Sequence, residues 1–126
     1  MKLRIKGNSL RLRVSRSELT RLMQIGRIEE TIRFAPEKDA TLTYALEQSV
    51  GYEAMTVRWR PQEVAVLLPQ EEARGWSEGD QVGLYCDCRV GEEILAVMVE
   101  KDFACLDGTE ADNEDTFPNP NQGAVC

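Results

Sequence analysis

Three cysteines in the second half of the chain carry the most reactive side chains. Cys86 and Cys88 are two residues apart in a predicted strand, so they share one face. Cys105 follows the next predicted strand, close enough in the chain to approach them. With an acidic residue or Cys126 as the fourth ligand, three thiolates could hold zinc. A redox-responsive thiol pair and simple burial as small apolar side chains are the alternatives, and burial is favoured because zinc knuckles usually show two residues between cysteines.

Acidic residues crowd the stretch that follows Cys105. They are Asp107, Glu110, Asp112, Glu114 and Asp115. Their carboxylates suit calcium or magnesium, although the spacing does not match the loop of an EF-hand. We expect a solvated acidic segment here, which ends in Phe117-Pro118-Asn119-Pro120. A divalent-metal site is one alternative, and docking of the segment onto the basic N-terminal hairpin of the same chain or of a neighbouring chain is another.

A charged cluster lies at the end of the last predicted strand. Glu100, Lys101 and Asp102 could act there as acid, base and electrostatic partner, with Cys105 as a nucleophile. The chain has no histidine, so the commonest general base is absent. An ordinary charged strand end explains the same residues, and we favour it.

The first fourteen residues predict a β-hairpin with one basic face. Apolar and basic residues alternate on both sides of the turn at Gly7-Asn8-Ser9. The residues expected to bind an anion are Lys2, Arg4, Lys6, Asn8, Arg11 and Arg13. Arginine and lysine bind phosphate and carboxylate groups, and the turn adds backbone donors. The alternative is a solvated face whose charges pair with nearby glutamates.

Two helices and several closely spaced strands must position these residues. Ser15 and Glu18 have capping-box spacing, and Gly26 is a typical helix end. A second helix is expected over 69–79 and contains Trp76. The strands follow one another too closely for many crossovers, which predicts antiparallel pairing. We predict one α+β domain over 1–106, a twisted antiparallel sheet or partly closed barrel with two helices, and a tail over 107–126.

Two details of this fold are predicted from the pattern. The run 94–99 is apolar on both faces, so we place it centrally and expect cover on both sides. Glu30 interrupts the apolar face that Ile28 and Ile32 define. No internal repeat is evident in the sequence.

Composition and charge narrow the function classes. The chain has 126 residues, 42% apolar and 29% charged, with a net charge of −7. That acidity disfavours duplex nucleic acid, although residues 1–34 are basic. No apolar run approaches the ~20 residues that span a bilayer, and no signal-peptide core is present. We therefore expect a cytoplasmic protein with reduced thiols.

Several segments together resemble a family of small uncharacterised bacterial proteins. They are Lys6-Gly7-Asn8-Ser9 within the basic hairpin, 42–47, Glu100-Lys101-Asp102-Phe103-Ala104-Cys105-Leu106, and Phe117-Pro118-Asn119-Pro120. The resemblance spans about residues 1–121. It implies one compact domain and no mechanism, and it does not include Cys86, Cys88 or Cys126.

The leading functional hypothesis is a small cytoplasmic binding module without catalysis and without a resident cofactor. Its partner would be a protein or a small anionic ligand, and a homo-oligomer is left open. One alternative is a metal-dependent or thiol-based enzyme that uses Glu100, Asp102 and Cys105. Another is a zinc- or redox-responsive protein that uses Cys86, Cys88 and Cys105.

Overall fold

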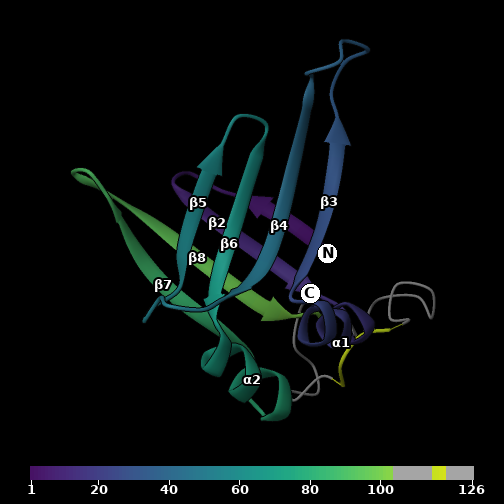
Figure 1. Cartoon of the computed structure of the whole chain (residues 1–126), viewed down its shortest axis with the longest axis vertical. Helices are drawn as coiled ribbons and strands as arrows, with labels where there is room; N and C mark the ends of the chain where they lie inside the picture. The colour runs from purple at the N-terminus through teal and green to yellow at the C-terminus, as the bar shows by residue number, and fades with distance from the viewer. Residues whose placement is uncertain (104–114, 119–126) are drawn as a thin grey trace.

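The computed structural model describes residues 1–103 and 115–118 and contains eight strands and two helices in that part of the chain (Figure 1). In chain order the elements are β1 (Lys2–Ile5), β2 (Ser9–Val14), α1 (Arg16–Ile25), β3 (Arg27–Arg33), β4 (Thr41–Ser49), β5 (Thr56–Arg60), β6 (Glu63–Pro69), α2 (Gln70–Glu78), β7 (Gly83–Val90) and β8 (Glu93–Lys101). The α+β class is confirmed. Neither helix has the length and apolar character of a membrane span.

The strands form two four-stranded sheets. Sheet A has the order β1-β2-β8-β7, and sheet B has the order β3-β4-β6-β5. In each sheet the outer pairs are antiparallel, and the central pair, β2 with β8 or β4 with β6, is parallel. Figure 1 shows sheet B crossing in front of sheet A, with both helices at one end. The predictions of a single antiparallel sheet and of a partly closed barrel were therefore wrong.

Alternating apolar residues of both sheets form one core between them. Sheet A contributes Leu12 and Val99, and sheet B contributes Leu46 and Val66, all almost fully buried. The helices close one end of this core with Leu19 and Leu22 from α1 and Ala73 and Trp76 from α2. The central position of β8 is confirmed, but its second face is only partly covered, because Ile94 is exposed there.

Local sequence signals explain where α1 begins and ends. The Ser15 side chain accepts a hydrogen bond from the Glu18 backbone amide, and the Glu18 carboxylate accepts one from the Ser15 amide. This capping box satisfies amide groups that have no partner within the helix. Gly26 ends the helix with a φ of 84°, a backbone conformation that costs glycine little. Both predictions are confirmed.

The two halves of the chain have the same connectivity, strand-strand-helix-strand-strand. Lys2 pairs with Arg13 in the first hairpin, and Thr56 pairs with Leu67 in the equivalent hairpin, a constant offset of 54 residues. The same offset relates Leu22 to Trp76, the buried anchors of the two helices. Each sheet combines one hairpin from each half. The fold is therefore a structural repeat.

Part of the predicted tail lies against the fold. The backbone amide of Phe117 donates to the Asp102 carbonyl at 2.8 Å, and the Arg16 amide donates to the Asp115 carbonyl at 2.9 Å. The Asp115 carboxylate also accepts hydrogen bonds from the Ser17 amide and hydroxyl, which lower the pKa of that carboxyl. Hydrogen bonds of residues 115–118 thus link the end of β8 to the start of α1.

Candidate anion-binding site

The β1–β2 hairpin places like charges directly opposite one another. Arg4 pairs with Arg11, and Lys2 pairs with Arg13, on the outer face of sheet A. Directly opposed like charges destabilise a strand pair unless anions compensate them. The neighbouring strand β8 supplies part of that compensation, because Glu100 lies in register with Arg13.

The hairpin carries five cations, which are Lys2, Arg4, Lys6, Arg11 and Arg13. Acidic side chains at the end of β8 pair with three of them. The Glu100 Oε1 atom lies 3.0 Å from Arg11 Nε and 3.8 Å from Arg13 Nε. Asp102 Oδ2 lies 2.9 Å from Lys2 Nζ. Arg4 and Lys6 are exposed and have no acidic partner among the residues that the structure describes. Positive charge therefore remains at one end of this face.

That uncompensated charge faces a hollow on the outer surface of sheet A. The hollow has a volume of about 280 Å³ and is lined by Arg4, Lys6, Ser9, Arg11 and Met98. The Ser9 hydroxyl donates to the Lys6 carbonyl at 2.5 Å, and the Arg11 Nη2 atom lies 3.5 Å from Met98 Sδ. These contacts fix the turn and the Arg11 side chain. The hollow can therefore offer two free cations and a third that is held by Glu100.

Asn8 takes a structural position beside this hollow. Its side-chain amide donates to the Ile94 backbone carbonyl at 2.7 Å, and its backbone carbonyl accepts a hydrogen bond from the Ala96 backbone amide at 3.1 Å. The hairpin turn is thereby fastened to β8. Of the six residues predicted to bind, the structure brings Arg4, Lys6 and Arg11 together in the hollow.

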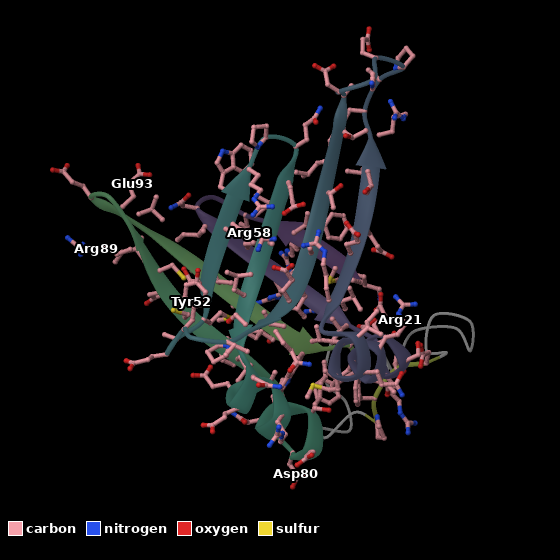
Figure 2. The ribbon with its side chains drawn as sticks, in the orientation of Figure 1. Arg21, Tyr52, Arg58, Asp80, Arg89 and Glu93 are labelled. Atoms are coloured by element: carbon pink, nitrogen blue, oxygen red, sulfur yellow. The ribbon has the colours of Figure 1, made fainter. Side chains whose placement is uncertain are left out.

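The equivalent hairpin of the second half has no comparable cluster. Arg58, which corresponds to Arg4, lies on the outer face of sheet B (Figure 2) and pairs with Glu47 at 2.9 Å and Glu63 at 3.2 Å. The offset of 54 residues places Ala65 where the first half has Arg11. Only Arg60, the equivalent of Lys6, lacks an acidic partner in the described part of that hairpin. The cationic hollow is therefore specific to the first half.

The structure separates Lys101 from Glu100 and Asp102, the other described residues of the predicted catalytic cluster. Glu100 lies on the outer face of sheet A and Asp102 pairs with Lys2, whereas Lys101 is buried on the opposite face of β8. Lys101 Nζ donates to the Gly79 carbonyl at 2.8 Å and lies 5.5 Å from the ring centroid of Phe117. Burial lowers the pKa of Lys101. Cys105 lies outside the described residues.

The two thiols of β7 are in contact. Cys86 and Cys88 have their Sγ atoms 3.6 Å apart, and the Cys88 thiol lies 3.8 Å from the Met55 carbonyl. Both pack against the core and are partly buried. Within residues 1–103 and 115–118, no three cysteine, aspartate or glutamate side chains gather as a metal site requires. The other predicted ligands, Cys105, Asp107, Glu110 and Asp112, lie outside this part of the chain.

Cys88 is expected to react slowly with iodoacetamide in the native protein. Burial and the neighbouring Cys86 raise its pKa from 9.0 to about 11, and the thiolate is the reactive form. At pH 8 the thiolate should be about 100-fold scarcer than in urea-unfolded protein, because each pH unit is a factor of ten. Mass spectrometry of the alkylated peptide gives the rate. A native rate that levels off near pH 9, as in urea, would contradict this pKa.

Sequence reasoning missed two residues of this face. Met98 forms part of the hollow, and Tyr85 lies opposite Met98 on β7. The signal was available in the alternation of β7, because Tyr85 falls between positions whose side chains face the core.

Comparison with known proteins identifies the family of the chain. A family model described as a family of unknown function, DUF7009, matches residues 1–121. No curated protein and no solved structure matches the chain. The match covers both sheets, both helices and the described part of the C-terminal segment. The chain therefore belongs to the DUF7009 family.

Proposed function

We propose that this protein is a non-catalytic cytoplasmic binding module that holds an anionic ligand in the hollow of the β1–β2 hairpin. The observation that carries the proposal is the hollow itself, where Arg4 and Lys6 face solvent without an acidic partner in the described chain. Arg11 adds a third cation whose guanidinium is positioned by Glu100.

Electrostatics supports an anion at this position. Opposed like charges at Arg4 and Arg11 are unfavourable, and a bound phosphate or carboxylate would relieve that repulsion. The net charge of −7 repels anions from a distance, but at physiological salt such fields fall off within about 8 Å. Binding should therefore be local to the hollow and should weaken as the salt concentration rises.

Calorimetric titration with inorganic pyrophosphate tests the proposal. The wild-type protein should bind pyrophosphate at low salt. The double variant Arg4→Gln/Lys6→Gln should bind at least about tenfold more weakly, because two charge-assisted contacts are lost. Circular dichroism of each variant establishes that the fold is retained.

The structural repeat provides a matched control. Arg60→Gln/Arg74→Gln also removes two exposed positive charges, one of them at the position equivalent to Lys6. This control should bind pyrophosphate like the wild type. Absence of binding by the wild type, or an equal loss in both double variants, would overturn the proposal.

A further inference from the structure

Tyr85 lies on the same outer face as the cationic hollow. The registers of the three strand pairs align one row across sheet A, Arg4 to Arg11 to Met98 to Tyr85. Tyr85 is 58% exposed. The row thus runs from free positive charge, across a methionine, to an exposed aromatic ring.

The ring of Tyr85 lies along the strand over Gly83. A Cβ atom built on Gly83 would lie 3.1 Å from the Tyr85 hydroxyl oxygen. Gly83 and Tyr85 share a face, because they are two residues apart in β7. The ring therefore occupies space that any other residue at position 83 would need for its side chain, and it presents its other side to solvent.

One carboxylate fixes both the ring and a cation of the hollow. The Tyr85 hydroxyl donates to Glu100 Oε2 at 2.9 Å, while Glu100 Oε1 lies 3.0 Å from Arg11 Nε. Burial and the hydrogen bond to Glu100 raise the pKa of Tyr85, so the phenol keeps the proton that it donates. The ring and the guanidinium are thus held in fixed relative positions before any ligand binds.

We infer that the ligand is a phosphorylated compound with a planar ring, of the nucleotide class. This inference rests on the proposed function, because the phosphate is assigned to Arg4, Lys6 and Arg11. Neighbouring strands are about 4.8 Å apart, so Tyr85 lies about 10 Å from Arg11 across the sheet. A nucleotide can bridge that separation with its ribose over Met98 and its base on the Tyr85 ring. Aromatic rings bind bases by stacking, without selecting their sequence.

Titrations with ribose 5-phosphate and adenosine monophosphate test this inference, because the two probes share a phosphate and a sugar. The wild-type protein should bind the nucleotide about tenfold more tightly, which is the size expected for one stacked base. Tyr85→Leu should abolish that preference, because it removes the ring on which the base would stack. Tyr85→Phe should keep most of it, since the ring remains and only the hydroxyl is lost.

The outcomes separate this inference from the proposed function. Equal affinity for the two probes in the wild type, with normal pyrophosphate binding, would overturn the nucleotide assignment alone. Equal effects of Tyr85→Leu and Tyr85→Phe on the nucleotide affinity would show that the aromatic ring itself does not bind the base. This result would also overturn the nucleotide assignment. Failure of pyrophosphate to bind would overturn both.

Discussion

Replacing Trp76 by alanine is expected to lower the free energy of unfolding by about 3–5 kcal/mol, the usual cost of truncating a buried tryptophan. Trp76 is fully buried, and its indole N–H donates to the Val82 carbonyl at 3.3 Å. Urea unfolding followed by circular dichroism measures the loss without relying on tryptophan fluorescence.

The second tryptophan of the chain is a natural control for this measurement. Trp59 is 70% exposed on β5, so Trp59→Ala should change the free energy of unfolding by no more than about 0.5 kcal/mol. Similar losses in the two variants would contradict the burial of Trp76 in the core and the exposure of Trp59.

The repeat explains why so much stability depends on Trp76. In α1 the two buried anchors are Leu19 and Leu22, and in α2 the equivalent positions hold Ala73 and Trp76. One half of the molecule uses two side chains of medium size, and the other uses a small one and a large one. Trp76 therefore fills most of the space that α2 covers, and Ala73 could not compensate for its loss.

The sequence predicted features that depend on neighbouring residues. The capping box of Ser15 and Glu18, the end of α1 at Gly26 and the alternation of the hairpin are local, and each is confirmed. The second helix was also found, although it begins at Gln70 rather than at Pro69. These predictions succeeded because caps and side-chain alternation act within a few residues.

Strand order could not be predicted in the same way. Ser9 pairs with Ala96, and Thr43 pairs with Glu63, in parallel pairs that join the two halves of the chain. Alternation identifies the buried face of a strand but not its partner, and close spacing suggested antiparallel neighbours throughout. The β4–β6 pair is parallel because the chain passes from β4 to the edge strand β5 and returns as β6 between them, and β2 and β8 come from opposite ends of the chain.

The repeat is hidden because equivalent positions keep a role while they change residue type. Gln48 and Lys101 occupy equivalent positions in β4 and β8, because they pair with Leu68 and Val14, which are themselves 54 residues apart. The Gln48 side-chain amide donates to the Leu22 carbonyl at 2.7 Å, and Lys101 Nζ donates to the Gly79 carbonyl at 2.8 Å. Both satisfy a carbonyl at the end of a helix, although their chemistry differs.

Glu30 interrupts the apolar face that Ile28 and Ile32 define because it has polar partners there. It is exposed and lies opposite Tyr44, whose hydroxyl donates to Glu30 Oε2 at 2.9 Å, and the Met1 ammonium group lies 3.4 Å from the same atom. These partners come from distant parts of the chain. The same limitation hid the link between Tyr85 and Glu100, which no spacing along one strand reveals.

Replacing Gly83 by alanine is expected to lower the free energy of unfolding by about 2 kcal/mol, a typical cost of forcing extra atoms into a packed region. The new Cβ would lie 2.5 Å from the Val99 carbonyl oxygen and 2.9 Å from Glu100 Cγ. The carbonyl belongs to the neighbouring strand, so β7 and β8 must move apart. Because Glu100 also holds Tyr85 and Arg11, this variant should weaken ligand binding as well as folding.

Gly75→Ala is the matched control, because it adds the same methyl group where no atom beyond the adjacent residues and the helix's own backbone lies within 4 Å. Gly75 lies inside α2, and alanine favours helix over glycine by about 1 kcal/mol. The two Gly→Ala changes should therefore shift the urea midpoint in opposite directions. If Gly83→Ala left the midpoint unchanged, β7 and β8 would not lie in close contact at Gly83, and the space beneath Tyr85 would tolerate a side chain at position 83.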